Sequence, residues 1–217
     1  MEQVVKHPPP PAAAPSASSP LANPVSVIGP QYCCPQPVDL VMVGKVWTLT
    51  EGNFTVTDIN GNIMFKIKAK SFSMHDCRLL LDATGNPICT LRPKIMTAHD
   101  RWQVFRGEST EEKDLIITVK RSSMIQVKSK LHVFLGNNPK EDVCDFRVEG
   151  TWSERSCVIY SGESNTIVAQ MHKKVSVESV LLGKDKFMVT VYPNVDYAFI
   201  VALVAILDGI NQQMRSA

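Results

Sequence analysis

The feature that most constrains the fold of this 217-residue chain is an unbroken apolar run near its C-terminus. Residues 197–207, YAFIVALVAIL, are eleven consecutive apolar or aromatic residues between Asp196 and Asp208. As an α-helix the run is about 16 Å long, whereas a bilayer hydrocarbon core is about 30 Å thick. A longer span would include both aspartates. Each aspartate costs about 2.5–3.5 kcal/mol at the bilayer centre, and each large apolar residue returns only about 0.3–0.6 kcal/mol.

A soluble interior favours the same residues more strongly, because burying each large side chain stabilises by about 1.5–3 kcal/mol. Pro193-Asn194 and Asp196 supply a start and a cap for a helix, and Gly209 supplies a stop. Because the run is apolar on every side, the helix must be enclosed on every side. We therefore predict a buried helix over about residues 196–210 of a soluble domain. Insertion of this helix into a membrane under some condition stays open as the alternative.

Composition divides the chain near residue 37. Residues 1–37 hold ten of the fourteen prolines, mixed with alanine and serine, which favours a disordered tail. From residue 38, eleven short runs rich in β-branched and aromatic residues alternate with turn residues, and almost no helical periodicity precedes residue 190. Asn60-Gly61 predicts a tight type I′ hairpin turn. We predict a single domain over residues 38–217 in which antiparallel strands close into a barrel, since closure removes exposed edges.

Five ungapped segments in order carry a family resemblance: LLLDATGNPICTLRPK (79–94), RWQVFRGES (101–109), DFRVEGTWSERSC (145–157), IVAQMHKK (167–174) and VYPNVDYAFIVALVAILDGI (191–210). With them, residues 38–211 resemble the plant LURP-one-related family. That family is similar to the C-terminal domain of tubby-like proteins and to the phospholipid scramblases. The resemblance implies a mainly β fold, a closed antiparallel barrel of about twelve strands around one central hydrophobic C-terminal helix.

The resemblance implies several kinds of function. Tubby-like proteins bind membrane phosphoinositides, scramblases move phospholipids, and some LURP-one relatives are linked to plant pathogen defence. We expect a non-enzymatic binding or regulatory protein that is tethered to membranes through phosphoinositides. A scramblase-like lipid-active protein and a protein–protein interaction scaffold are the alternatives. The chain lacks the longer Cys-rich cluster, the calcium-binding segment and the longer tail after the helix that scramblases have, which argues against the first alternative.

Two features are candidate binding or modification sites. Lys66, Lys68 and Lys70 alternate in FKIKAK, so a strand places all three on one face. There they either bind anionic lipid headgroups or form a solvated outer face that resists aggregation. Cys33 and Cys34 are adjacent and lie next to the domain, so they are either sites of lipidation or two ordinary reduced thiols.

No catalytic motif is complete in the sequence. GESTE (107–111) and GESNT (162–166) each lack the last glycine of a Gly-x-Ser-x-Gly elbow, and no metalloprotease, Walker or dinucleotide motif occurs. Asp58-x-Asn60-x-Asn62 begins like a calcium loop, but no glutamate closes it. We therefore predict that the protein is not an enzyme and binds no metal and no cofactor.

Net charge and cysteine spacing limit which partners the protein can bind and in which cellular compartment it is expected. A net charge of +2 and the absence of a basic recognition helix argue against direct DNA binding. No apolar signal segment opens the sequence, and the six cysteines have no CxxC spacing. We expect an intracellular monomer, cytoplasmic with access to the plasma membrane or the nucleus, whose partners are anionic phospholipid headgroups or a protein.

Overall fold

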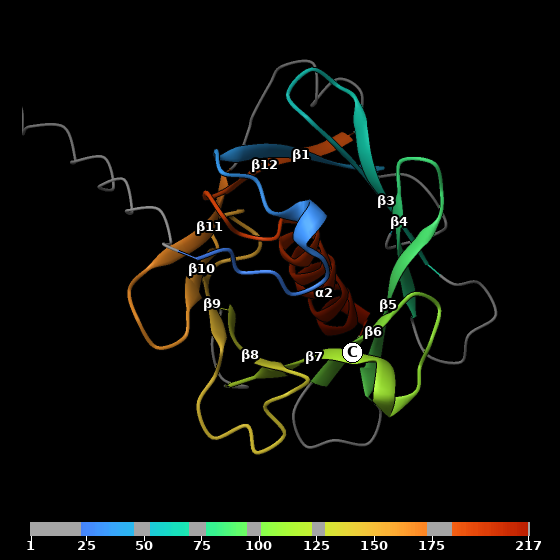
Figure 1. Ribbon diagram of the computed structural model, residues 1–217. Helices are drawn as coiled ribbons and strands as arrows, with labels where there is room; N and C mark the ends of the chain where they lie inside the picture. Colours follow the sequence, from blue (N-terminus) through green and yellow to red (C-terminus); the bar gives the residue numbers. More distant parts are fainter. Residues whose placement is uncertain are drawn as a thin grey trace, which may run out of the picture.

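Twelve antiparallel strands form a closed barrel around one long helix (Figure 1). Each strand pairs with its neighbours in the sequence, and β1 pairs with β12 through eight residue pairs to close the barrel. The predicted fold class is therefore confirmed. The computed structural model describes residues 23–45, 53–69, 77–94, 101–122, 129–172 and 184–216. The elements are η1 (Pro30–Tyr32), β1 (Val38–Lys45), β2 (Phe54–Thr57), β3 (Ile63–Ala69), β4 (Arg78–Asp82), β5 (Pro87–Lys94), β6 (Arg101–Arg106), η2 (Glu112–Asp114), β7 (Leu115–Arg121), β8 (Ser129–Leu135), β9 (Phe146–Gly150), β10 (Val158–Ser161), β11 (Ile167–His172), β12 (Lys184–Val191) and α2 (Tyr197–Ser216).

The strands alternate between inward and outward side chains, because one face of each strand lines the core. In β1, Leu40 and Met42 are fully buried, whereas Val41 between them points outward and is half-buried. Strand β5 is not predicted by the sequence pattern. Its prolines, Pro87 and Pro93, are atypical of a strand interior. Pro87 is tolerated because it is the first residue of the strand.

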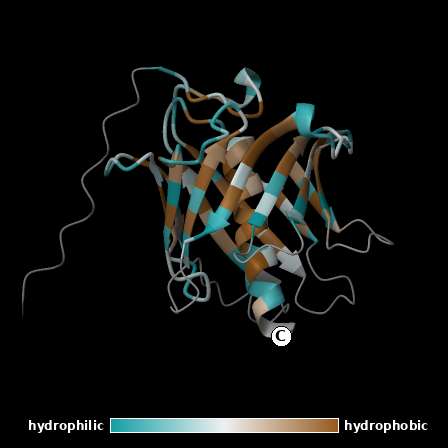
Figure 2. Cartoon of the chain, turned by 90° about the horizontal axis from the view of Figure 1, so that it is seen from below, coloured by the Kyte–Doolittle hydropathy of each residue, from teal (hydrophilic) through white to brown (hydrophobic). Residues whose placement is uncertain are grey.

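Helix α2 fills the barrel. Every residue from 198 to 207 is 0–2% exposed, and Figure 2 shows the apolar helix surrounded by the strands. The ring centroids of Phe199 and Phe146 on β9 are 4.8 Å apart. The predicted buried helix is confirmed. Within the described residues, the window Tyr197–Met214 is long and apolar enough to cross a membrane, but 72% of it is buried inside the protein.

A segment of residues 23–37, which we call the strap, lies across the end of the barrel at which α2 begins (Figure 1). The fully buried carboxylate of Asp196 holds it there. Oδ1 accepts the backbone N–H of Phe199 at 3.0 Å, so Asp196 caps the helix as the sequence predicts. Oδ2 accepts three backbone N–H groups of the strap, from Val27 at 3.1 Å, Ile28 at 2.7 Å and Gly29 at 2.9 Å.

Aromatic packing also fixes the strap. The ring of Tyr32 lies 5.8 Å from that of Phe65 on β3 and 5.6 Å from that of Tyr197, the first residue of α2. The predicted tail of residues 1–37 therefore divides. Residues 23–37 pack on the barrel because Asp196 and the rings provide partners that composition alone does not reveal, and residues 1–22 lie outside the described residues.

A buried ion pair holds α2 near the end of its buried part. Arg78 on β4 donates a hydrogen bond of 2.9 Å to the carboxylate of Asp208. The next residue, Gly209, lies against Trp102 on β6. A Cβ added to Gly209 would meet the indole ring at 2.6 Å. The prediction that Gly209 ends the helix is wrong, since α2 continues to Ser216. The missing side chain makes room for the indole ring instead.

The β2–β3 and β4–β5 turns share one construction. Asp58 accepts the backbone N–H groups of Asn60 and Asn62 and the side-chain amide of Asn62, at 2.8–2.9 Å. Asp82 likewise accepts the backbone N–H and the side-chain amide of Asn86, at 2.8 and 2.9 Å. Both turns lie at the strap end of the barrel, because the β3 residue next to this rim, Phe65, contacts Tyr197 of α2.

The predicted type I′ turn at Asn60-Gly61 is wrong. Gly61 has a left-handed φ of +88°, but Asn60 does not have a positive φ. The backbone N–H of Asp58 donates to the carbonyl oxygen of Asn62, so three residues form the loop instead of two. A three-residue hairpin needs only its last residue in the left-handed region.

Candidate functional site

Strand β3 places two of the three candidate lysines on the outer face of the barrel. The inward residues Phe65 and Ile67 are 2% and 1% exposed, whereas Lys66 is half-buried and Lys68 is exposed. Lys70 lies outside the described residues. The structure thus brings Lys66 and Lys68 together on one face.

The side chains of the two lysines have different surroundings. Lys66 Nζ donates a hydrogen bond of 2.8 Å to the carbonyl oxygen of Ala83 in the neighbouring β4–β5 turn. This contact holds the amine close to the rim that carries both turns. Lys68 is two residues farther along the strand, about 6.8 Å from Lys66 at the usual rise of a β-strand. The lysines therefore form a short row that runs away from the rim.

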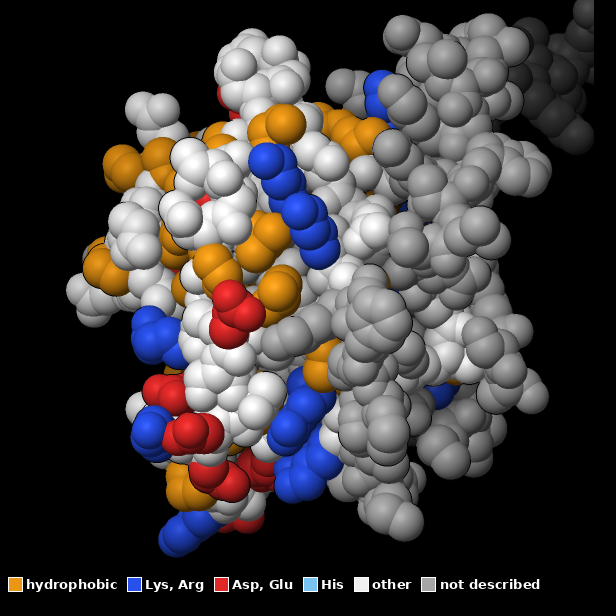
Figure 3. All heavy atoms as spheres, turned by 90° about the vertical axis from the view of Figure 1, so that its right-hand side faces the viewer, with side chains coloured by type: hydrophobic (Ala, Val, Ile, Leu, Met, Phe, Trp, Pro, Cys, Tyr) orange, Lys and Arg blue, Asp and Glu red, His pale blue; other side chains and the backbone are white. Residues whose placement is uncertain are grey.

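Apolar side chains lie beside this row. The β3–β4 register pairs Lys66 with Leu81 and Lys68 with Leu79. Of these leucines, Leu79 is half-buried, whereas Leu81 is buried at 5% exposed. On β5, Arg92 faces outward, about 12 Å from Lys68 by the usual strand spacing and rise. Figure 3 shows this face, with hydrophobic side chains between basic ones. The surface is amphipathic and is not a continuous cationic stripe.

The tip of the β2–β3 hairpin adds exposed apolar surface. Ile59 is 69% exposed and Ile63 is 45% exposed. Among the described residues, only two other large hydrophobic residues are exposed, Val143 at 58% and Met214 at 44%. Half of this exposed apolar set therefore lies at one hairpin tip, at the start of the strand that carries the lysine row.

The two candidate lipidation sites, Cys33 and Cys34, lie on the strap and are half-buried. Burial, and to a smaller extent the charge of Asp196, raises the pKa of the Cys33 thiol, which lowers its reactive thiolate fraction. Because Tyr32 packs on Phe65, the strap brings both cysteines to the barrel end that carries the β2–β3 tip.

The comparison with known proteins decides the family. A family model described as LURP-one-related matches residues 38–208. The chain belongs to the LURP-one-related family. The resemblance predicted from the five segments is confirmed.

The relatives cover nearly the whole chain. The protein is 58% identical to Protein LURP-one-related 15 of Arabidopsis thaliana over 218 residues, which cover 100% of both chains. It is 53% identical to Protein LURP1 of the same species over 192 residues, which cover 88% of this chain and 93% of that protein. The X-ray structure of an Arabidopsis thaliana protein is similar with a TM-score of 0.69 and 54% identity, and the match covers 86% of this chain and 98% of that one.

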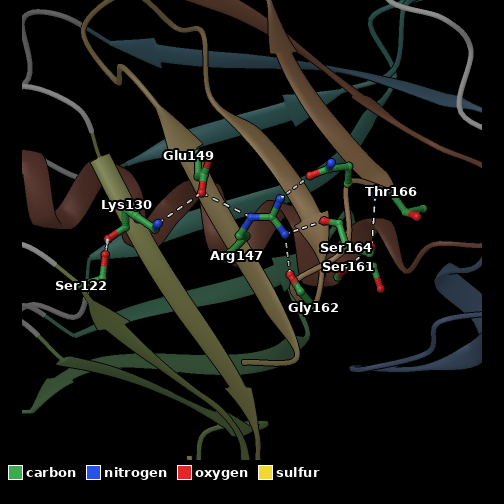
Figure 4. A network of polar contacts seen from close by, with 9 residues as sticks. Ser122, Lys130, Arg147, Glu149, Ser161, Gly162, Ser164 and Thr166 are labelled. Carbon is green, nitrogen blue, oxygen red and sulfur yellow. Dashed lines mark hydrogen bonds and ion pairs between the residues drawn. The ribbon is translucent and has the colours of Figure 1, made fainter. Parts of the chain in front are cut away.

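Two polar clusters of this LURP-one-related barrel were not predicted, and the first centres on Arg147 of β9. Its guanidinium donates to the carbonyl oxygens of Gly162 at 2.8 Å and of Ser164, and pairs with Glu149 at 3.3 Å (Figure 4). The ring of Tyr160 lies 4.3 Å from the guanidinium carbon. Since carbonyl groups of the β10–β11 turn take up these donors, Arg147 shapes that turn and is not a candidate for an anionic ligand.

The second cluster centres on Glu141 in the β8–β9 connection. Its carboxylate pairs with Arg101 of β6 at 3.0 Å and with Lys120 of β7, so the connection folds back over the outside of the barrel. These three side chains are only 15–26% exposed. The glutamate forms ion pairs with two outward cations of β6 and β7. The lysine row of β3 is therefore the stronger candidate for binding an anionic ligand.

The described part of the chain contains no group of three or more His, Cys, Asp or Glu side chains placed to hold a metal ion. The six cysteines are free thiols, and four are buried: Cys77, Cys89, Cys144 and Cys157. Burial raises the pKa of Cys157 to about 12. These four thiols are side chains of the protein interior.

Proposed function

We propose that this protein is a non-enzymatic binding and regulatory protein that attaches reversibly to anionic phospholipid headgroups, phosphoinositides included. The observation that carries the proposal is the outward placement of Lys66 and Lys68 on the strand that begins at the exposed β2–β3 tip. Because α2 fills the barrel, the proposal concerns the outer surface. Under this proposal the protein is intracellular and exchanges between the plasma membrane, the cytoplasm and the nucleus.

Surface electrostatics supply the reversibility. Each basic residue near an anionic membrane contributes about 1 kcal/mol, so Lys66, Lys68 and Lys70 together contribute about 3 kcal/mol. This attraction decays within a Debye length of about 8 Å at physiological salt. Binding should therefore weaken as salt rises, and hydrolysis of the headgroup phosphates should release the protein.

A scramblase-like, lipid-active role is the competing proposal, and the length of α2 favours it. That role requires α2 to leave the barrel and to break the contacts of Asp196 and Asp208. The seven large apolar side chains between residues 198 and 207 contribute about 10–20 kcal/mol of burial to the fold. This is as large as or larger than the usual net stability of a domain, about 5–15 kcal/mol, so the emptied barrel would unfold. A surface-binding role leaves the fold intact, and we prefer it.

We extend the proposal to regulation of plant defence, which the resemblance to the LURP-one relatives implies. The similarity to Protein LURP1 and to Protein LURP-one-related 15 supports this extension. A plant line that lacks the protein is expected to support more pathogen growth than its parent. If the lipid-binding surface matters for this role, a transgene with Lys66, Lys68 and Lys70 replaced by alanine should not restore resistance.

Liposome flotation tests the proposed function. Wild-type protein and the K66A/K68A/K70A variant are floated with phosphatidylcholine vesicles, with and without phosphoinositides. We expect wild-type protein to float only with the anionic vesicles, and the variant to bind at least tenfold more weakly, since about 3 kcal/mol is lost.

A matched variant controls for net charge. K113A/K130A/K140A removes the same charge from exposed lysines of three other places on the surface. It should float like the wild type. Equally weakened vesicle binding in both variants would mean nonspecific electrostatic attraction and would contradict a binding site on β3. Failure of wild-type protein to float with any vesicle would leave a protein partner as the remaining binding role.

A further inference from the structure

The two similar turns at the rim provide an internal comparison. The β2–β3 turn, DINGNI, and the β4–β5 turn, DATGNP, share the aspartate, the left-handed glycine and the asparagine that build the loop. They differ at the exposed positions, where Ile59 corresponds to Ala83 and Ile63 corresponds to Pro87. The turn itself therefore does not require isoleucines, because the same hydrogen bonds form without them.

Packing within the protein covers only part of the two isoleucines. Ile59 is 69% exposed and Ile63 is 45% exposed, so most of the first side chain and about half of the second are in water. Keeping two large apolar side chains exposed at one tip carries a solubility cost with no gain in the isolated protein. A partner that removes them from water accounts for their placement.

The tip is rigid before it meets any partner. Asp58 turns back into the loop and accepts three hydrogen bonds. The hydrogen bond from the side chain of Asn62 is the largest cause of a lowered pKa of Asp58, so the carboxylate stays ionised while its oxygens are satisfied within the loop. A preformed tip loses little conformational entropy on binding. The isoleucines are therefore presented in a fixed arrangement.

The order of residues along β3 matches the layers of a membrane surface. Ile63 stands at the rim, Lys66 is about 10 Å farther along the strand, and Lys68 about 17 Å farther. Interfacial segments bury their apolar residues about 5–10 Å into the boundary between headgroups and acyl chains. With the isoleucines at that depth, the backbone of Lys66 lies about 10 Å farther out, near the level of the lipid phosphates.

The charge distribution around the rim selects the docking angle. The β6–β7 connection carries exposed glutamates, Glu108, Glu111 and Glu112. In Figure 3 most acidic side chains lie in the lower left part of this face, with basic side chains among them, whereas the upper part carries basic side chains between hydrophobic ones. An anionic surface repels the acidic part and attracts β3. The barrel therefore meets the surface tilted onto the β2–β3 hairpin.

We propose that the β2–β3 hairpin is a membrane anchor, in which Ile59 and Ile63 enter the acyl boundary of an anionic bilayer while Lys66 and Lys68 contact lipid phosphates. This inference rests on the proposed function and adds an apolar, salt-resistant component to it. The occupant is the bilayer itself and not a soluble headgroup, because a free inositol phosphate offers nothing apolar to the isoleucines.

Vesicle binding at two salt concentrations tests the anchor. Full-length wild-type protein and I59N/I63N are titrated with phosphatidylcholine vesicles that contain one-fifth phosphatidylserine. The matched control V143N/M214N alters the other two exposed hydrophobic residues of the described chain. We expect I59N/I63N to bind about tenfold more weakly per isoleucine lost at high salt, where lysine contacts are screened. V143N/M214N should bind like the wild type, and all three proteins should unfold at the same temperature.

The outcomes separate the anchor from the proposed function. If wild-type protein binds anionic vesicles and I59N/I63N binds them equally well at both salt concentrations, the anchor is refuted and electrostatic headgroup binding stands. If wild-type protein binds no anionic vesicle, both are refuted. As a second measurement, the fluorescence of Ile59→Trp, after subtraction of the wild-type spectrum, should shift to the blue and be quenched by brominated acyl chains. Insensitivity to the brominated lipid while the variant is bound would also refute insertion, and soluble inositol phosphates should cause no shift.

Discussion

The guanidinium of Arg78 on β4 lies 2.9 Å from the carboxylate of Asp208 on α2, and the two side chains are only 4% and 9% exposed. Arg78 also donates to the carbonyl oxygen of Ala205 and to the side chain of Gln212. One arginine of the barrel wall thus holds three groups that span about two turns of the helix, from Ala205 to Gln212. A charge buried at this depth is tolerated only while its partner is present.

Removing one member of this pair should be strongly destabilising. We expect D208A to lower the free energy of unfolding by about 3–5 kcal/mol, because the Arg78 charge remains buried without its partner. Urea unfolding followed by tryptophan fluorescence measures the change. The double variant R78M/D208L removes both charges and should be far closer to the wild type. If D208A were as stable as the wild type, the pair would not support the fold.

Gly209 should resist the substitution that normally improves a helix. Gly→Ala inside a helix usually stabilises by about 1 kcal/mol. Here the new Cβ would meet the Trp102 ring at 2.6 Å, so we expect G209A to destabilise by about 1–3 kcal/mol. Thermal unfolding of G209A, W102F and the double variant tests the contact. The cost of G209A should shrink in the W102F background, and strict additivity would contradict the close approach.

Loss of the Asp196 carboxylate should free the strap. In D196A, the amides of Val27, Ile28 and Gly29 lose their shared acceptor, and the helix loses its cap. We expect hydrogen exchange of these three amides to accelerate at least tenfold, and stability to fall by about 1–2 kcal/mol from the cap alone. D145A provides the control, since Asp145 accepts hydrogen bonds at the β8–β9 connection. Unchanged exchange in D196A would show that the strap has other, sufficient anchors.

Truncation of one helix side chain should test the plugged barrel directly. Phe199 is fully buried, so F199A should cost about 3–5 kcal/mol of stability. Met214, near the end of the same helix, is 44% exposed, and M214A should change stability by less than about 0.5 kcal/mol. Both variants are compared by urea unfolding. Similar losses in the two variants would mean that α2 is not enclosed as described.

The six thiols should differ in reactivity. Burial raises the pKa of Cys157 to about 12 from its ordinary value of 9.0, so at pH 8 its thiolate fraction is about one in ten thousand. A raised thiol pKa stabilises the fold below about pH 9 and loses this contribution as pH rises toward about 12. At pH 8 we expect a maleimide to label Cys33 and Cys34 first, and the buried thiols only after unfolding. Rapid native labelling of Cys157 would contradict its burial.

Local sequence patterns were sufficient for the main elements of this fold. The apolar run of residues 197–207 implied an enclosed helix because no other environment favours it, and Asp196 is its cap. Strand β5 was missed because prolines at its first and seventh positions obscure the strand pattern. The continuation of α2 beyond Gly209 was missed because the reason for that glycine is Trp102, more than one hundred residues away in the sequence.

The candidate site could be predicted only along one strand. Period-two alternation was enough to place Lys66 and Lys68 outward, whatever strands lie beside them. Their neighbours Leu79 and Leu81 depend on the pairing register with β4, which no local pattern specifies. The ion pair between Arg101 and Glu141, forty residues apart in the sequence, depends on a loop that folds back over the outside of the barrel. Contacts across the barrel required the three-dimensional structure.

Helix α2 follows all twelve strands in the chain, which has a consequence for biosynthesis. Each strand leaves the ribosome before α2, which its inner face contacts in the folded protein. Nascent chains therefore expose apolar strand faces that have no partner, which favours aggregation. Productive collapse has to wait until α2 has been synthesised. A premature stop just upstream of Asp196 should therefore yield an aggregation-prone product for cellular quality control rather than a shortened working protein.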